Sequence, residues 1–269
     1  MSKIEIHSLL ENIIEKKIKE INKTKERIPL NKILKKIEKV NYQKRNFKEA
    51  IKRKIDRISL IAECKKATPS CGIINRNYDI REIVKEYYNS GFVDALSILT
   101  EKNYFLGKIS DLTLAKKEVN LPVLRKDFII DEYQIYESIY YKADAILLIS
   151  GILNKKQLKI LYNKAKSFGL DVVVEVHTKQ DIELIDFDVD IIGINNRNLK
   201  TFEVDITTTE KLIKYIPKNV VVISESGISS NRDVRYIYDL KVDAILVGSY
   251  FMKASNITQA LMSLIKFQK

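Results

Sequence analysis

Charged side chains end several short apolar runs of this sequence. Glu63 ends the run SLIAE, Lys126 ends PVLRK and Glu175 ends DVVVE. Apolar runs of this kind form protein cores, and packing does not explain a charge at their ends because buried charges are costly. A lysine and two carboxylates that converge supply proton donors and acceptors. We therefore interpret these three residues as candidates for acid–base catalysis.

Further polar residues follow the same pattern. Lys65 lies just after the first run, and Asn195 ends the run IIGIN, with Arg197 two residues later. The run VVVIS leads into Glu225-Ser226-Gly227, and DAILV leads into Gly248-Ser249. Glycine lets the backbone approach an anion closely, and amide N–H groups at a helix start bind phosphate oxygens. The two glycine–serine segments therefore predict a phosphate site.

The elements that position these residues alternate along the chain. Helix-like stretches such as 79–89, 154–168 and 207–215 separate short runs that read as strands. Apolar strands joined by helices imply a parallel sheet covered on both faces. Eight such units in about 210 residues predict an α/β fold of the (β/α)8, or TIM, barrel type, in which active sites lie at the carboxyl ends of the strands. The predicted strands are 59–63, 93–99, 122–126, 145–149, 171–175, 191–195, 220–224 and 243–247.

A helical extension precedes the eight units. Residues 1–46 carry two apolar stripes at helical spacing, over 9–21 and 30–40, and a third short piece begins near Phe47. Ser8 and Glu11 fit a capping box that would open the first helix. We expect one domain over residues 1–269, with the extension packed partly over the catalytic mouth. The alternative is an extension that plugs the barrel bottom or mediates dimerisation.

Composition excludes several classes of protein. The formal net charge is +12, but the lysines alternate with glutamates, so we expect no nucleic-acid partner. We predict a cytoplasmic protein without a membrane partner, because no apolar run is long enough to span a bilayer and no signal peptide is evident. Cys64 and Cys71 lack metal-type spacing and read as reduced thiols. His7 and His177 lie far apart, so we expect no metal, and His177 reads as a structural or rim residue.

Eight segments carry a resemblance to a known family. In order along the chain they resemble the signature of the indole-3-glycerol-phosphate synthases of tryptophan biosynthesis, and the likeness covers nearly the whole chain, including the extension. Any one segment is weak evidence, whereas eight in order are specific. The segments are IAECKKATPS (61–70), LSILTEKNYF (96–105), LRKDFI (124–129), ADAILLI (143–149), VVEVH (173–177), GINNRNL (193–199), SESGI (224–228) and LVGSYFM (246–252).

The resemblance implies a carboxy-lyase that converts 1-(2-carboxyphenylamino)-1-deoxyribulose 5-phosphate into indole-3-glycerol phosphate, carbon dioxide and water, without a cofactor. It implies that Lys126 is a general acid at the ring-closing carbonyl and that Glu175 transfers protons during dehydration. Lys65 would bind the anionic substrate and its phosphate and act as a further acid. The other implied roles are orientation of the substrate by Glu63, Asn195 and Ser226, carboxylate contacts from Thr68 and Arg197, an aromatic slot of Phe105, Phe128 and Leu147, and phosphate binding by Gly227, Gly248 and Ser249.

Some positions depart from the family pattern, and alternatives remain open. Cys64 and Ala67 stand where many relatives have an aromatic and a basic residue, and Tyr250 and Phe251 are also less usual. We expect lysines near other cations to have a lowered pKa and to act as acids near neutrality. The alternative functions are another phosphate-binding barrel, such as a phosphoribosylanthranilate-type isomerase, or a Schiff-base aldolase that uses Lys126. We expect a monomer or a weak homodimer.

Overall fold

Eight parallel strands close into a barrel in the computed structural model, which describes residues 3–40, 43–199 and 201–265. Each strand pairs with the strand that follows it in the barrel sequence, and the last pairs with the first in the register Ser59 to Ala244. The (β/α)8 barrel prediction is confirmed, and the predicted strand ends agree to within two residues. The strands are β1 (Ser59–Cys64), β4 (Ala95–Leu99), β5 (Val123–Lys126), β6 (Ala145–Ile149), β7 (Asp171–Val176), β8 (Ile191–Asn195), β9 (Val221–Glu225) and β10 (Ala244–Val247).

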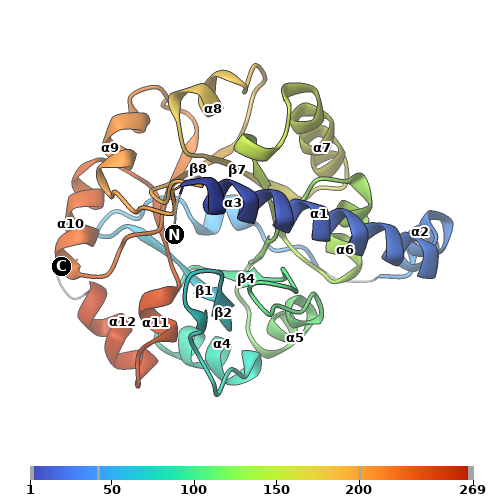
Figure 1. Cartoon of the computed structure of the whole chain (residues 1–269). Helices are drawn as coiled ribbons and strands as arrows, with labels where there is room; N and C mark the ends of the chain where they lie inside the picture. Colours follow the sequence, from blue (N-terminus) through green and yellow to red (C-terminus); the bar gives the residue numbers. More distant parts are fainter. Residues whose placement is uncertain (1–2, 41–42, 200, 266–269) are drawn as a thin grey trace.

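Helices surround the barrel as an outer layer (Figure 1). Their apolar residues recur at helical spacing, as in α4, where Ile80, Ile83, Val84 and Tyr87 are buried against the strands. A short antiparallel pair, β2 (Ala67–Thr68) and β3 (Gly72–Ile73), lies in the loop after β1. The outer elements are α4 (Ile80–Asn89), α5 (Ser110–Glu118), α6 (Glu132–Tyr140), η1 (Ser150–Ile152), α7 (Lys155–Ser167), α8 (Lys179–Glu183), α9 (Thr207–Ile213), α10 (Asn231–Asp239), α11 (Ser249–Met252) and α12 (Ile257–Ile265).

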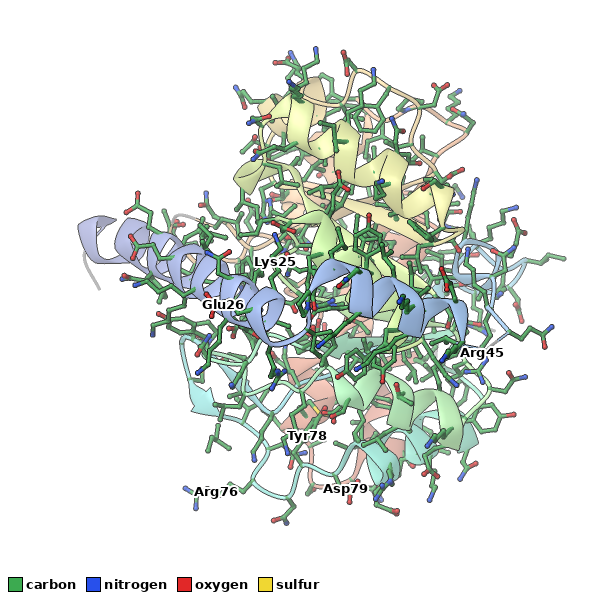
Figure 2. All side chains as sticks on the ribbon, turned by 90° about the vertical axis from the view of Figure 1, so that its right-hand side faces the viewer. Lys25, Glu26, Arg45, Arg76, Tyr78 and Asp79 are labelled. Atoms are coloured by element: carbon green, nitrogen blue, oxygen red, sulfur yellow. The ribbon has the colours of Figure 1, made fainter. Side chains whose placement is uncertain are left out.

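The extension reaches both ends of the barrel. Helix α1 (Lys3–Arg27) runs across the open face of the barrel in Figure 1, and α2 (Leu30–Glu38) packs along α6. Figure 2 shows Lys25 near the end of α1 and Arg45 toward the right-hand edge of the view. The capping box predicted at Ser8 is wrong, because α1 already includes Lys3 and no glycine or proline interrupts residues 3–7.

The short helix α3 (Phe47–Ala50) closes the amino-terminal end of the barrel. Phe47 and Ile51 have no exposed surface and pack with side chains that fill the barrel interior, among them Leu124 and Ile223. The helix that fills the barrel bottom is therefore not part of the extension as predicted, whereas α1 lies at the cavity, as expected. The long helix covers the mouth, and α3, just beyond the predicted limit of the extension at residue 46, plugs the bottom.

A row of aspartates fixes the segment around α3. The backbone N–H of Arg45 donates to Asp144 Oδ1 at 2.8 Å, and that of Lys48 donates to Asp171 Oδ2 at 3.1 Å. These aspartates stand at or just before the starts of barrel strands. Related contacts join the Lys48 side chain to Asp190 at 2.6 Å, the Arg53 backbone to Asp243 at 3.3 Å and the Arg57 guanidinium to Asp94 at 2.6 and 2.7 Å.

Candidate active site

A cavity of about 780 Å³ opens at the carboxyl ends of the strands. Its walls come from loops that follow the barrel strands, together with Leu10 and Ile13 of α1. The structure therefore places all of the sequence-predicted site residues around one space. They are Glu63, Lys65, Thr68, Phe105, Lys126, Phe128, Leu147, Glu175, Asn195, Arg197, Ser226, Gly227, Gly248 and Ser249.

Lys126 lies between two carboxylates in the wall of this cavity. Its ammonium group contacts Glu175 Oε2 and lies 2.6 Å from Glu225 Oε2. The strands β5, β7 and β9 carry these residues, and both carboxylates are almost fully buried. Gly193 of β8 makes room for Glu225, because a side chain at this position would overlap the Glu225 carboxylate. One lysine thus contacts two carboxylates, one from β7 and one from β9.

The charges of this group set one another's protonation. Burial opposes the charged form of Lys126, but Glu175 and Glu225 outweigh it and raise the pKa of the lysine above its usual value. Burial also opposes ionisation of Glu175, yet Lys126 and His177 lower the pKa of that carboxyl. Burial and the negative charge of Glu175 raise the pKa of Glu225 to about 7, although Lys126 acts in the opposite direction. The expectation of a lowered lysine pKa is wrong for Lys126, because its closest neighbours are carboxylates.

A second lysine and carboxylate pair stands at the end of β1. Lys65 Nζ lies 2.7 Å from Glu63 Oε1, and the Ser97 hydroxyl donates to Glu63 Oε2 at 3.5 Å. Gly248 packs directly on this carboxylate, since a Cβ atom there would lie 2.5 Å from Glu63 Oε1. The close approach explains why a glycine directly follows the last strand. Gly248 therefore shapes the Glu63 side of the cavity as well as the predicted phosphate side.

Loops after β8 and β9 form the next part of the wall. The backbone N–H of Arg197 donates to Asn195 Oδ1 at 3.0 Å, and the Arg197 guanidinium donates to the Phe202 carbonyl at 2.9 Å. Ser226 and Gly227 have φ angles of 68° and 81°, a left-handed conformation that glycine adopts readily and serine rarely. Asn196 holds the turn by donating to the Ser226 carbonyl at 3.0 Å. These contacts fix the backbone of the turn beside the cavity.

The predicted phosphate loops differ in how they meet their helices. Gly248 caps α11, so Ser249 begins that helix directly at the cavity. The helix after Ser226-Gly227 begins only at Asn231, beyond the N-cap Ser230. Ser226-Gly227 thus precedes a helix, but residues 228–230 separate this turn from the helix start. At the cavity this turn presents a backbone in the left-handed conformation.

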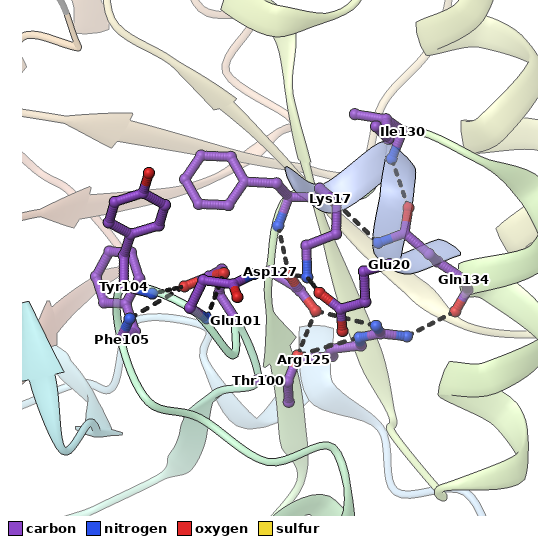
Figure 3. A network of polar contacts seen from close by, with 12 residues as sticks. Lys17, Glu20, Thr100, Glu101, Tyr104, Phe105, Arg125, Asp127, Ile130 and Gln134 are labelled. Atoms are coloured by element: carbon purple, nitrogen blue, oxygen red, sulfur yellow. Dashed lines mark hydrogen bonds and ion pairs between the residues drawn. The ribbon is translucent and has the colours of Figure 1, made fainter. Parts of the chain in front are cut away.

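Apolar side chains also line the cavity. Phe105, Phe128 and Leu147 lie there together with Leu10 and Ile13 of α1. The Glu101 carboxylate accepts backbone hydrogen bonds from residues 103, 104 and 105, at 2.7 to 3.0 Å, and so fixes the loop that carries Phe105 (Figure 3). An aromatic ring would find apolar contacts in this part.

A buried ion-pair network joins α1 to this rim (Figure 3). Lys17 Nζ lies 2.9 Å from Asp127 Oδ1, and the Arg125 guanidinium lies 3.0 Å from Asp127 Oδ2. Thr100 donates to the same Asp127 oxygen at 2.6 Å. Burial opposes ionisation of Asp127, but Lys17 and Arg125 prevail and lower its pKa to about 2. Asp127 also accepts from the backbone N–H of Phe128 at 2.9 Å, so the network reaches the cavity wall.

Sequence reasoning noted Glu225 as a strand-end residue and left it out of the candidate set. The cavity also includes Leu10 and Ile13, which the sequence marks only as part of a helical stripe. His177 does not line the cavity, but its ring lies 3.1 Å from Glu175 Oε1. In the ranges that the structure describes, no helix is long and apolar enough to span a membrane, and no group of three or more His, Cys, Asp and Glu side chains is placed to hold a metal ion.

Similarity to known proteins covers almost the whole chain. The family model for indole-3-glycerol phosphate synthase matches residues 10–264. Indole-3-glycerol phosphate synthase of Thermoanaerobacter pseudethanolicus is 47% identical over 262 residues, which are 97% of this chain and 98% of the relative. The enzyme of the same name from Caldanaerobacter subterraneus is 49% identical over 247 residues, 91% of this chain and 93% of the relative.

Solved structures of lower identity share the fold alone. The 3-hexulose-6-phosphate synthase from Salmonella typhimurium superposes with a TM-score of 0.60 at 16% identity, over 76% of this chain and 99% of that one. The N-acetylmannosamine-6-phosphate 2-epimerase from Clostridium perfringens gives 0.59 at 15% identity, over 82% and 96%. The family match and the high identity of full-length relatives carry more weight. On that basis, the chain belongs to the indole-3-glycerol phosphate synthase family.

Proposed function

We propose that the protein closes the indole ring of 1-(2-carboxyphenylamino)-1-deoxyribulose 5-phosphate, releasing carbon dioxide and water to give indole-3-glycerol phosphate. Family membership makes it a carboxy-lyase. The observation that carries the proposal is the position of Lys126, whose ammonium group lies between Glu175 and Glu225 in a cavity with an apolar wall and two glycine–serine loops. The cavity thus offers acid, base, aromatic and phosphate-binding groups together.

Lys126 is the proposed acid of ring closure. The aromatic carbon that bears the carboxylate attacks the ketone, and the carbonyl oxygen becomes an alkoxide that needs a proton. Glu175 and Glu225 keep Lys126 protonated, so the donor is present before the substrate arrives. Loss of carbon dioxide then returns the bonding electrons to the ring. The ammonium of Lys126 also faces the leaving carboxylate in this arrangement.

Glu175 and Lys65 are the proposed proton-transfer groups of dehydration. Loss of water from the ring-closed intermediate needs an acid at the departing hydroxyl and a base for the released proton. Lys65 lies beside Glu63 on β1, and Glu175 lies on β7, so the two stand on different parts of the barrel wall. Glu63 orients Lys65 through their 2.7 Å ion pair. Asn195 and Ser226 are proposed to orient the substrate's polyol chain.

The remaining residues are proposed to bind the substrate. Its phosphate would meet the backbone of the two glycine–serine loops, where barrels of this type commonly bind phosphate, with Lys65 supplying charge. Its aromatic ring would lie on the apolar wall, and its carboxylate would meet Arg197 and Thr68. The proposed phosphate contacts are Lys65, Gly227, Gly248 and Ser249, and the proposed ring contacts are Phe105, Phe128 and Leu147.

A direct assay tests this function. Purified protein is mixed with the carboxyphenylamino-deoxyribulose phosphate, and the rise of indole fluorescence is followed while product is confirmed by mass. Turnover supports the proposal, and absence of product from folded protein would reject it. The Schiff-base aldolase and the phosphoribosylanthranilate-type isomerase are not favoured, because the family model and the relative that matches 97% of this chain are both named indole-3-glycerol phosphate synthase. If borohydride covalently trapped the substrate on Lys126, that result would favour the aldolase instead.

Cellular context and assembly are also proposals. We expect a cytoplasmic enzyme, in agreement with the unpaired thiols of Cys64 and Cys71. We expect one domain over residues 1–269, which the ion pair of Lys17 with Asp127 and the insertion of α3 into the barrel end support. We expect a monomer or weak homodimer, which sedimentation at several concentrations would check.

A further inference from the structure

His177 lies against the catalytic group without entering the cavity. It follows β7 directly, two residues after Glu175, and its side chain is only 6% exposed. His177 Nε2 lies 3.1 Å from Glu175 Oε1, while Lys126 contacts the other oxygen, Oε2. The Glu175 carboxylate is therefore held at both oxygens, by the lysine on the cavity side and by the histidine behind it.

Asp181 fixes the histidine from its other side. Asp181 Oδ2 lies 3.7 Å from His177 Nδ1 and accepts hydrogen bonds from the backbone N–H groups of His177 and Thr178, at 2.7 and 3.0 Å. The capping box of α8 sets this geometry, because Thr178 is the N-cap and Asp181 is its partner. The position of the carboxylate is thus decided by the start of a helix and does not depend on substrate.

The resulting row of side chains alternates in charge. From the outside inward it runs through Asp181, His177, Glu175, Lys126 and Glu225. The charged groups against the imidazole are Asp181 from α8 and Glu175 from β7, and the other two lie beyond Glu175. Burial opposes protonation of the ring, but Asp181 and Glu175 raise the pKa of His177 to about 9. The two carboxylates thus favour the protonated form of the imidazole.

We propose that His177 is a positioning residue that fixes the Glu175 carboxylate in the orientation needed for proton transfer. This inference rests on the proposed function, since it assigns a task to Glu175. A carboxylate held at one oxygen rotates about its Cγ–Cδ bond, and proton transfer depends steeply on the distance and direction of the accepting oxygen. A second contact at Oε1 removes that rotation. His177 acts only through Glu175 and does not touch the substrate.

Two amide substitutions separate this role from a purely structural one. In His177→Gln the side-chain amide reaches the place of Nε2, beside Glu175 Oε1. In His177→Asn the shorter side chain brings its amide near the place of Nδ1, toward Asp181. Both variants remove the same charge and keep a polar amide, so they differ mainly in which neighbour they serve. Steady-state kinetics and thermal denaturation are measured for both beside the wild type.

The positioning role predicts that the glutamine variant is more active than the asparagine variant. We expect His177→Asn to lower kcat about tenfold or more with KM within about twofold of wild type, because Glu175 acts on proton transfer. We expect His177→Gln to recover most of that loss, to within about threefold of wild type. Equal losses in the two variants, a better Asn than Gln variant, or wild-type kcat in both would overturn the proposal.

An NMR titration tests the same contact without turnover. The chain contains two histidines, His7 and His177, so a His7→Gln variant assigns their imidazole signals. We expect the His177 signal to titrate well above pH 7, and to titrate at least one pH unit lower in Glu175→Gln. An unchanged midpoint in that variant would show that the ring and Glu175 do not interact. Failure of the wild type to turn over substrate would instead reject the proposed function and leave this contact standing.

Discussion

Lys17 of helix α1 lies 2.9 Å from Asp127, the residue that follows Lys126 at the end of β5. Both side chains are almost completely buried, with 2% and 1% of their surface exposed. The extension is thus attached to the barrel beside its proposed catalytic lysine. A shift of α1 would therefore act on Asp127 and on Phe128, whose backbone N–H donates to the Asp127 carboxylate.

Replacement of Lys17 by methionine should destabilise the protein by about 3 kcal/mol, because it leaves a buried carboxylate with one cation fewer. The contribution of Asp127 is complete at pH 7, since its pKa of about 2 lies below the ordinary value of 3.8 and stabilisation is lost only as the pH falls through the lower value. Urea denaturation at pH 7 measures the change.

Lys25→Met is the matched control for that variant. Lys25 lies 2.7 Å from Asp131, but the two side chains are 41% and 34% exposed. Solvent screens such a pair, so the loss should stay below about 1 kcal/mol. Equal destabilisation by the two substitutions would show that burial does not increase the contribution of the Lys17–Asp127 pair to stability.

Lys126→Gln and Glu175→Gln should each lower kcat by on the order of a hundredfold or more, the usual contribution of an acid–base group. Glutamine keeps the shape of Glu175, whereas at position 126 it removes the cation between two buried carboxylates, so folding is checked for each variant. Steady-state fluorescence kinetics, with circular dichroism to verify folding, measure the effect. A variant with near-normal kcat would lose its assigned role.

Glu225→Gln should make the protein more stable at pH 8 than the wild type. The folded-state pKa of Glu225, about 7, lies above the ordinary value of 4.5. The folded state then binds this proton more tightly, so the stability that Glu225 contributes is complete below pH 4.5 and is lost as the pH rises through 7. The variant lacks this loss and should gain about 3 kcal/mol over the wild type between pH 4.5 and pH 8.

Urea denaturation at the two pH values checks that prediction, with Glu82→Gln as control. The Glu82 side chain is 72% exposed, so its removal should leave the pH dependence as in the wild type. If the stability of Glu225→Gln changed with pH by the same amount as that of the wild type, the raised pKa of Glu225 would be contradicted. We expect the added stability to come with lower kcat, because Glu225 holds Lys126 in place.

The fold could be predicted because each barrel strand is a buried apolar run of its own. The contacts that close the barrel bottom could not, because Arg45 and its partner Asp144 lie far apart in sequence and only the barrel brings them together. The same holds for the raised pKa of Lys126. Its direction depends on two carboxylates from different strands, and no local pattern encodes that distance.

Glu225 shows that a strand-end position alone does not reveal a site residue. The sequence places Glu225 directly after the run VVVIS, but its contact with Lys126 depends on β9, which extends to Glu225 and pairs it with Asn195 of β8. That pairing puts the carboxylate in the ring of strand-end residues. Gly248 was predicted for its backbone amide, and its contact with Glu63 depends on the pairing of β1 with β10.

Gly248→Ala should therefore impair more than phosphate binding. The added methyl group would lie 2.5 Å from Glu63 Oε1, so Glu63 must move and release Lys65 from its ion pair. We expect a higher KM and also a kcat lowered about tenfold or more, as for loss of an oriented acid. Ser249→Ala, which keeps the backbone and the contact between Gly248 and Glu63, should raise KM with little change in kcat. A Gly248→Ala variant with altered KM alone would limit this glycine to the phosphate.

Two deletions should distinguish the segment that affects kinetics from the segment that is needed for folding. Deletion of residues 1–28 removes α1, and with it Leu10, Ile13 and Lys17, while α2 and α3 remain. We expect this protein to fold with reduced stability and to show a higher KM and a kcat/KM lowered about tenfold or more, because the cavity loses an apolar wall that excludes water.

Deletion of residues 1–52 also removes Phe47 and Ile51, which are fully buried in the end of the barrel, and the backbone donors to Asp144 and Asp171. Truncation of one buried phenylalanine alone costs about 3–5 kcal/mol, which is comparable to the whole stability of many domains. This longer deletion should therefore fail to give a cooperative thermal transition. Steady-state kinetics and thermal denaturation of both proteins test the division. Unchanged kinetics in a folded 1–28 deletion would leave α1 with a role in stability alone, and a cooperative transition in the 1–52 deletion would show that the barrel closes its bottom without α3.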